Sequence, residues 1–266
     1  MLMLPLEFCF QVEKVLKSVI DDCYPYEWDE DHITRDILKG LRKSFRDVTL
    51  FGYRYQLNIN WEVYKYTGTP EHLYGDVAVL VKIRFRNGDL SEGVGFLEAK
   101  KRSIDSNRFD SLKNTQLEDI LSIAPQAFLL LYDYENITTF INSISYLNDF
   151  DDYGEKYLQG LDKHGHFPRF LSETYCVVAP ANLITSTSPK TTSLYNRSLP
   201  LSYQLCYRYL FGFDLEYDST AIDIAKGYPP QRRYPRYVMV IRVGQNVPPP
   251  ELDEPLNSEV LQILEE

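Results

Sequence analysis

The feature that most constrains the fold of this chain is a strand–turn–strand unit that begins at Asp76. The residues that follow it, 77–85, are strongly apolar, which is typical of a buried strand. Asn87 and Gly88 come next, and Asn-Gly is a dipeptide that tight hairpin turns prefer. We therefore predict that residues 94–101 return as the antiparallel partner of the first strand.

The periodicity of apolar residues predicts further helices and strands around this unit. Helices are expected over 7–20, 29–45, 110–123, 136–145 and 200–211. Strands are expected over 127–134, 175–179 and 237–243, and residues 50–66 form either one strand or a bent pair. This order predicts an α/β fold in which helices flank a central mixed β-sheet.

The chain of 266 residues is long enough for one sizeable core with an extension. We place the α/β core at 1–184, an α+β extension packed on it at 185–246, and a Pro-rich acidic tail at 247–266. The tail has a small apolar face at Val260, Leu261 and Leu264, so we expect it to dock on its own domain or on a partner.

Several properties predict a cytoplasmic protein. No stretch approaches the roughly 18 consecutive apolar residues that a membrane span requires, so no contact with a membrane is expected. The N-terminal segment has no basic region of the kind that begins a secretion signal. The four cysteines are widely spread without a CxxC pair, which predicts neither a zinc ribbon nor a disulfide framework.

The returning strand carries polar residues whose spacing suggests chemistry. Residues two apart on a strand share a face, so Glu98 and Lys100 point to one side, and the residues between and before them point to the other. Pairing across the turn would bring Asp76 near Glu98. Two carboxylates and the carbonyl oxygen of Ala99 form the all-oxygen site that Mg²⁺ prefers, and Mn²⁺ is the alternative ion. A neighbouring lysine adds positive charge at a phosphorus and orients or deprotonates the attacking water.

These residues resemble a known family. Asp76 follows Gly75 and is separated by 21 residues from the triplet Glu98-Ala99-Lys100. Over residues 27–135 this pattern resembles the PD-(D/E)XK nuclease superfamily, with its restriction-endonuclease-like fold. The resemblance implies that Asp76 and Glu98 bind the metal and that Lys100 is catalytic. The Pro that usually precedes the Asp is replaced by Gly75.

The resemblance extends to two helical positions. It implies a site-facing Gln116 on the helix after the motif and an acidic residue on the 29–45 helix that completes the metal shell, either Glu30 or Asp31. The alternative interpretation is an ordinary helix N-terminal charge and a solvated helix face. The implied activity is hydrolysis of phosphodiester bonds, in DNA rather than RNA, as in anti-phage defence or mobile-element systems.

Basic residues near the motif are candidates for holding nucleic-acid phosphates: Lys101, Arg102, Arg108 and Lys113. Lys82, Arg84 and Arg86 alternate along one strand, which fits either a phosphate-binding face or a plain solvated face. The net charge of −10 opposes tight, sequence-blind DNA binding. A second hypothesis is therefore a nuclease-like fold that acts as a non-catalytic nucleic-acid-binding or assembly subunit, as a homo-oligomer or with a protein partner, through the tail.

Two other motifs give weaker support for a binding site. His164 and His166 form a pair without an acidic or Cys partner at metal-ligand spacing. Residues 232–236 mix arginine and tyrosine as a nucleic-acid groove does, although a plain loop before a strand explains them as well. No Gly-rich phosphate loop or GxSxG motif supports an NTPase or a serine hydrolase.

Overall fold

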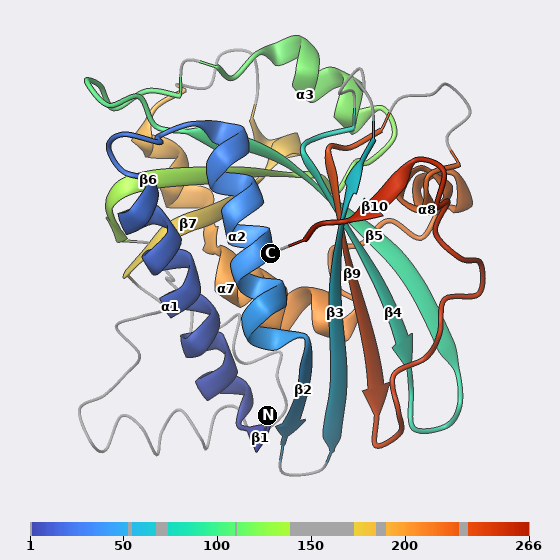
Figure 1. Ribbon diagram of the computed structural model, residues 1–266. Helices are drawn as coiled ribbons and strands as arrows, with labels where there is room; N and C mark the ends of the chain where they lie inside the picture. The colour runs from blue at the N-terminus through green and yellow to red at the C-terminus, as the bar shows by residue number, and fades with distance from the viewer. Residues whose placement is uncertain are drawn as a thin grey trace.

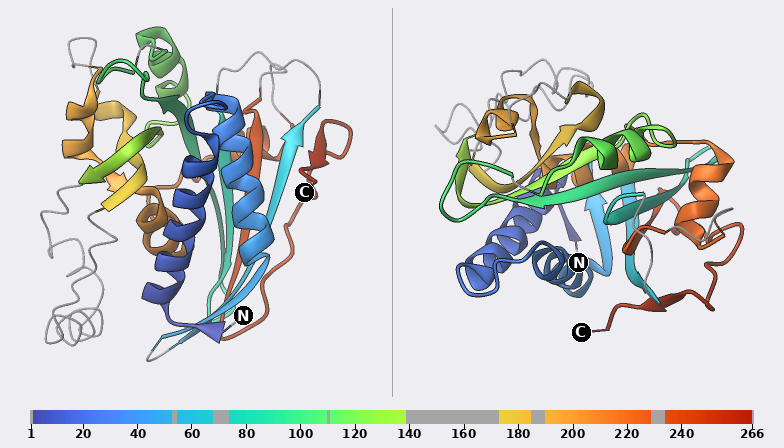
Figure 2. Two further views of the ribbon diagram at one scale, coloured as in Figure 1. Left: turned by 60° about the vertical axis from the view of Figure 1, so that its left-hand side comes forward. Right: turned by 90° about the horizontal axis from the view of Figure 1, so that it is seen from above.

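The strands of the protein form one mixed sheet. The computed structural model describes residues 2–52, 55–67, 74–109, 111–138, 173–184, 190–228 and 234–265. Within these ranges ten strands are joined in the order β1-β2-β3-β9-β4-β5-β6-β7-β8, and β10 pairs with β3 (Figure 1). Helices cover both faces of the sheet (Figure 2), so the expected α/β class is confirmed.

The helices and strands occur in nearly the predicted order, with the following bounds. The strands are β1 (Leu2–Met3), β2 (Asp47–Phe51), β3 (Gln56–Tyr66), β4 (Val77–Arg84), β5 (Leu90–Lys101), β6 (Phe128–Thr138), β7 (Glu173–Pro180), β8 (Leu199–Pro200), β9 (Tyr237–Gln245) and β10 (Leu261–Ile263). The α-helices are α1 (Pro5–Cys23), α2 (Glu30–Phe45), α3 (Asn114–Leu121), α7 (Leu201–Tyr203) and α8 (Ser219–Lys226). The helical run that starts with α7 continues through a π-helical and a 3₁₀ turn, η3 (Gln204–Arg208) and η4 (Tyr209–Phe211).

The predicted hairpin is confirmed. β4 and β5 pair antiparallel, from Val77 opposite Leu97 to Arg84 opposite Leu90. Gly88 has φ +93°, a left-handed conformation that glycine adopts without strain. β5 begins four residues earlier than the expected 94, because pairing continues up to the turn.

Alternate residues of β4 face two separate cores. Val77, Val79 and Val81 belong to the first core, which packs under α1 and α2. Ala78 and Leu80 belong to the second core, on the side of α3 and α8. The sheet is thus buried on both faces, which explains why β4 reads as a continuous apolar run rather than an alternating one.

Two sequence expectations are wrong at particular residues. The helix expected over 136–145 does not begin there, because β6 continues to Thr138 and pairs past a bulge with β7; the rest of that segment lies outside the described residues. Lys82 is not on a solvated or phosphate-binding face: it is 1% exposed and pairs with Glu92 at 3.2 Å and with Asp253. The reason is that the tail covers this part of β4.

The C-terminal part of the chain is built into the sheet. β9, from the segment expected to form an extension, lies between β3 and β4, antiparallel to the first and parallel to the second. β10 pairs with β3, so the tail docks on its own domain. Residues 1–184 therefore lack a central strand of the sheet without β9. Among the described residues, no helix has the length and apolar character that crossing a membrane requires.

A buried carboxyl group on α1 makes stability depend on pH. Glu13 accepts a hydrogen bond of 2.5 Å from the Thr174 hydroxyl. Burial raises the pKa of Glu13 to about 7, and the nearby polar groups of Ser202, Thr174 and the Tyr175 backbone oppose the rise. The folded protein therefore binds this proton more tightly than the unfolded chain does. Stability from this group is full below the ordinary pKa of 4.5 and is lost as pH rises to about 7.

The variant Glu13→Gln should remove this dependence. Relative to the wild type, the variant is expected to gain roughly 3 kcal/mol in free energy of unfolding between pH 5 and pH 8. Denaturant titrations at both pH values measure this difference. Asp22→Asn, at an exposed position of the same helix, is the control and should show no such gain. An equal difference from the wild type at both pH values would contradict the prediction.

Candidate active site

The backbone of Asp76 is fixed at the point where three strands meet. Its N–H donates to the carbonyl of Leu97 on β5 at 2.8 Å, and its carbonyl accepts from the N–H of Tyr237 on β9 at 2.9 Å. One carboxylate oxygen, Oδ2, accepts from the backbone N–H of Ala99 at 2.9 Å. The paired register of β4 and β5 begins at Val77 opposite Leu97, and Asp76 lies just before it. Asp76 is close enough to Glu98 for its charge to raise the pKa of that carboxyl group, in agreement with the predicted approach of the two residues.

Gly75 explains why the usual proline is absent before Asp76. Its φ is +81°, which proline cannot adopt because its ring holds φ near −65°. A Cβ at this position would lie 2.7 Å from the carbonyl oxygen of Leu97. The left-handed turn and the close approach together aim Asp76 across the end of β5.

Gly75→Ala is expected to destabilise the protein by about 2 kcal/mol or more, from left-handed strain and from the contact with Leu97. Gly88→Ala is a matched control: Gly88 has a similar φ of +93°, but a methyl group there would have no atom of the described residues within 4 Å. Denaturant unfolding of both variants separates strain from steric overlap. Equal losses of unfolding free energy in the two variants would show that the contact with Leu97 does not contribute to the destabilisation.

Glu98 and Lys100 lie on one face of β5, as the strand period predicts. Leu97 and Ala99 point into the first core, whereas Glu98 and Lys100 point to the other side. Both are almost fully buried, with exposed fractions of 5% and 2%. Lys100 Nζ lies 2.5 Å from Glu98 Oε1, so the two side chains form a short ion pair.

The structure places Glu30, rather than Asp31, beside this pair. Glu30 Oε1 lies 3.2 Å from Lys100 Nζ, and its Oε2 accepts from the Ser111 hydroxyl at 3.0 Å. Asp31 instead pairs with Arg236 at 2.7 Å and accepts from the Tyr237 hydroxyl at 2.8 Å. Glu30, Asp76, Glu98 and Lys100 thus come together from α2, the start of β4 and β5; we call them the carboxylate–lysine cluster.

The charges of the cluster perturb one another. Burial, and next the neighbouring Asp76, raise the pKa of Glu98 to about 7. Burial also raises the pKa of Asp76, although Lys100 and Arg236 oppose the shift. For Lys100 burial lowers the pKa, but the three carboxylates outweigh it and the net shift is upward. The cluster therefore has three carboxyl groups for one lysine, and the raised pKa values of Asp76 and Glu98 reflect the cost of charging these groups together in a buried place.

The backbone adds a further oxygen at the same edge. In a strand, the N–H and the C=O of one residue point toward the same neighbour. Because the N–H of Ala99 reaches the Asp76 carboxylate, the carbonyl of Ala99 points toward the same edge, beyond the first residue of β4. Two carboxylates and this carbonyl can therefore face one ion.

The other site residues predicted from the sequence lie outside the carboxylate–lysine cluster. The amide oxygen of Gln116 on α3 is buried and has no hydrogen-bond partner among the described residues, and no described contact joins it to the cluster. Arg102 pairs with Asp133 at 3.1 Å and with Glu135 at 2.5 Å. Its guanidinium group therefore links the end of β5 to β6. These contacts argue against a role for Arg102 in holding phosphate.

The remaining basic candidates lie nearer solvent. The side chains of Arg108 and Lys113 are exposed, and that of Lys101 is partly buried. Arg108 forms an isolated antiparallel bridge with Thr191, and Lys113 precedes α3. The His164–His166 pair, and Arg232 and Arg233, lie outside the described residues.

Arg236 belongs to the basic and aromatic segment 232–236, but the sequence did not connect it with Asp76 or Asp31. It directly precedes β9, and because β9 lies beside β4, its charge reaches Asp76 and helps to counter the rise in the pKa of that carboxyl group. Its only local signal was a basic residue before a buried strand.

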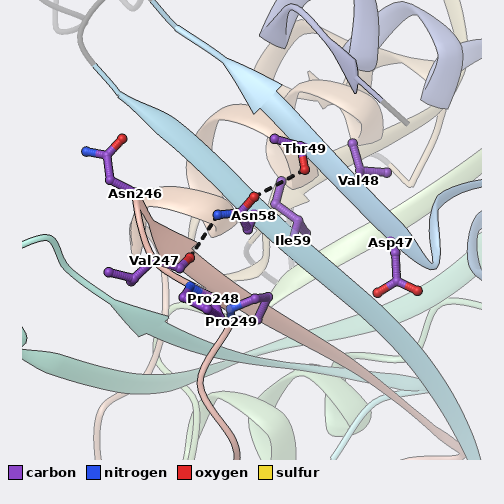
Figure 3. A pocket seen from close by; sticks show the side chains of 9 residues that line it. All are labelled: Asp47, Val48, Thr49, Asn58, Ile59, Asn246, Val247, Pro248 and Pro249. Carbon is purple, nitrogen blue, oxygen red and sulfur yellow. Dashed lines mark hydrogen bonds between the residues drawn. The ribbon is translucent and has the colours of Figure 1, made fainter.

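A separate hollow of about 470 Å³ lies at the opposite end of β9, between β2, β3 and the start of the tail (Figure 3). Its lining is mostly amide, hydroxyl and apolar side chains, and Asp47 is the one ionisable residue in it. It therefore lacks the grouped charges that distinguish the carboxylate–lysine cluster.

No protein-family model, curated protein or solved structure matches the chain at a significant level. The function is therefore argued from the geometry of the cluster together with the sequence motif.

Proposed function

We propose that the protein is a Mg²⁺-dependent nuclease of the PD-(D/E)XK type, acting on DNA rather than RNA. The observation that carries the proposal is the convergence of three carboxylates and one buried lysine from three separate elements. A structural ion pair needs one acid and one base. Three carboxyl groups around one lysine can ionise together only with further positive charge, which a divalent cation would supply.

The donor set fits a hard cation. Asp76, Glu98 and the carbonyl of Ala99 offer only oxygen, which is the ligand type that Mg²⁺ takes, and Mn²⁺ accepts the same set. Glu30 would complete the shell directly or through a water molecule. No soft donor lies in the cluster, so nothing in it favours zinc.

The bound ion would supply positive charge that polarises a phosphodiester and lowers the pKa of an attacking water. The side chains of the protein position the groups that take part in the reaction. Glu98 and Glu30 hold Lys100 Nζ at 2.5 Å and 3.2 Å, so the ammonium group is fixed at the edge of the metal-binding oxygens. Because its pKa is raised, Lys100 stays protonated and can stabilise the negative charge that develops on the phosphoryl oxygens.

Purified protein should cleave plasmid or linear DNA in Mg²⁺ or Mn²⁺, and chelation should stop cleavage. Single-stranded DNA and RNA of the same sequence, offered in competition, establish which nucleic acid is preferred. The test also separates the non-catalytic alternative, which predicts retention of DNA without cleavage in every metal. Asp76→Asn is the catalytic control, because activity that persists in it would come from a contaminant.

A further inference from the structure

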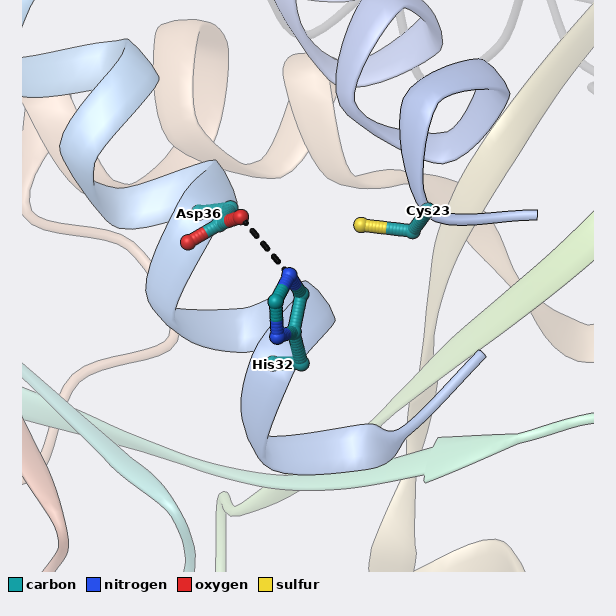
Figure 4. A group of neighbouring side chains, drawn as sticks. All are labelled: Cys23, His32 and Asp36. Carbon is teal, nitrogen blue, oxygen red and sulfur yellow. Dashed lines mark ion pairs between the residues drawn. The ribbon is translucent and has the colours of Figure 1, made fainter. Parts of the chain in front are cut away.

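A second group of metal-ligating side chains lies at the junction of α1 and α2. Cys23 is the last residue of α1, and His32 and Asp36 are one turn apart on the same face of α2. Their ligand atoms all lie within 4.8 Å of one another. The Cys23 thiol points into the space beside the His32 ring and the Asp36 carboxylate (Figure 4).

A fourth donor comes from the loop between the helices. Glu27 Oε2 lies 2.8 Å from His32 Nε2, and Asp36 Oδ2 lies 3.1 Å from the same nitrogen. A single ring nitrogen carries at most one proton, so two carboxylate oxygens share one donor. A cation in place of that proton would satisfy both oxygens at once. We call Cys23, Glu27, His32 and Asp36 the helix-junction cluster.

We propose that the helix-junction cluster binds one zinc ion, with Cys23, His32 and Asp36 as ligands and Glu27 at the fourth position. The mixture of sulfur, nitrogen and oxygen donors suits zinc, whereas Mg²⁺ takes oxygen alone. Donor atoms around a tetrahedral zinc lie roughly 3–4 Å apart, as bonds of about 2.0–2.3 Å require. The ligand atoms of Cys23, His32 and Asp36 lie within 4.8 Å of one another, so side-chain rotation has to bring them closer to reach that geometry.

The surroundings suit such an ion. The thiol of Cys23 is buried, whereas the side chain of His32 is partly exposed to solvent. Burial, and next the negative charges of Asp36 and Glu27, raise the pKa of the Cys23 thiol, and the positive charge of Arg35 opposes them. Zinc reverses this unfavourable field, because it stabilises a thiolate among carboxylates.

One positive group lies against the cluster and must adjust. Arg35 Nη2 lies 3.0 Å from His32 Nδ1 and 3.5 Å from His32 Nε2, and Arg35 Nε donates to Asp36 Oδ1 at 2.9 Å. Zinc on Nε2 requires a proton on Nδ1, so Nη2 has to withdraw from the ring. The bond to Asp36 Oδ1 can remain, because zinc uses the other carboxylate oxygen.

The loop is held in place independently of any ion. Tyr24 stacks on Tyr134 with ring centres 4.5 Å apart, and the Trp28 indole donates to the carbonyl of Arg102 at 2.7 Å. This packing fixes both sides of Glu27 and presents its carboxylate to His32. Zinc would therefore tie α1 to the first turn of α2, which also carries Glu30 of the carboxylate–lysine cluster.

Cobalt substitution tests the proposal in the full-length protein. A thiolate ligand gives Co²⁺ a charge-transfer absorption that an all-oxygen site cannot produce, so the two clusters are distinguished. We expect the band in the wild type, in Glu98→Gln and in Cys9→Ala, which removes another buried thiol of α1. Cys23→Ser should lose it, and His32→Gln should bind zinc at least about 100-fold more weakly.

Zinc competition and metal analysis after dialysis give the stoichiometry, which should be one thiolate-bound ion per chain. Absence of the band in the wild type, or a band that survives Cys23→Ser, would overturn the proposal. If Cys23→Ser fails to fold, His32→Gln decides, because its partly exposed side chain can be replaced without opening the core. Unchanged zinc affinity in that variant would also overturn it.

Discussion

Replacing Glu98 by glutamine is expected to reduce Mg²⁺-dependent cleavage on the order of 10³-fold or more. The substitution keeps the size of the side chain but removes the carboxylate that pairs with Lys100 at 2.5 Å and is proposed to bind the metal together with Asp76. A metal ligand and part of the field that positions Lys100 are lost together. Rates of plasmid cleavage over a Mg²⁺ titration measure the effect.

The same variant should also lose stabilisation by the metal. Ligand at 100 times its dissociation constant stabilises a native protein by about 2.7 kcal/mol, so the melting temperature of the wild type should rise with Mg²⁺. That rise should be absent in Glu98→Gln and preserved in Glu62→Gln, which changes a glutamate on β3. Metal-dependent cleavage that persists in purified Glu98→Gln would refute the assigned site.

Replacing Lys100 by glutamine should separate chemistry from metal binding. Cleavage is expected to fall by roughly 10²–10⁴-fold, the range typical of a group that assists proton transfer or stabilises developing charge. Glu98 and Glu30 would lose their cation, so Mg²⁺ should bind at least as tightly as in the wild type. Cleavage rates and Mg²⁺-dependent melting, measured on one preparation, test both statements.

Lys43→Gln is the matched control for this variant, because Lys43 is an exposed lysine on α2. It should cleave and melt as the wild type does. A different result for Lys100→Gln, in which Mg²⁺ no longer stabilises the protein, would assign Lys100 to holding the carboxylates rather than to the reaction. Retained cleavage would remove it from the mechanism altogether.

The local sequence pattern was sufficient to predict the hairpin part of the candidate site. The Asn87-Gly88 turn and the apolar run before it predict the hairpin, since turn chemistry and burial act over a few residues. The two-residue period of a strand then places Glu98 and Lys100 on one face. Asp76 lies just before the paired register and reaches β5 through its own N–H, which donates to Leu97, and its carboxylate, which accepts from Ala99.

The other part of the site depended on segments far apart in the chain. The sequence left Glu30 and Asp31 as competing choices, and the structure separates them because Arg236 and Tyr237 bind Asp31. Both partners arrive with β9, which enters the sheet between β3 and β4. The neighbours of a strand are not encoded by its own periodicity, so an expected extension became a central strand.

Lys82 and Cys23 also have positions that the sequence shows but surroundings that only the tertiary structure shows. The alternation of charges on β4 is visible in the sequence, but burial of Lys82 depends on the tail that brings Asp253 to it. The cysteines show no metal-ligand spacing in the sequence, yet Cys23 meets His32 and Asp36 once α1 packs against α2.

The sequence by itself therefore determined the α/β class, the hairpin, and the shared face of Glu98 and Lys100, because each depends on the local period and on turn chemistry. Only the tertiary structure decided that Glu30 joins them, that Arg236 stands beside Asp76, and that the α1–α2 junction gathers four metal-ligating side chains. Those contacts depend on which elements pack together. That choice is made by burial of the two cores as a whole rather than by any one segment.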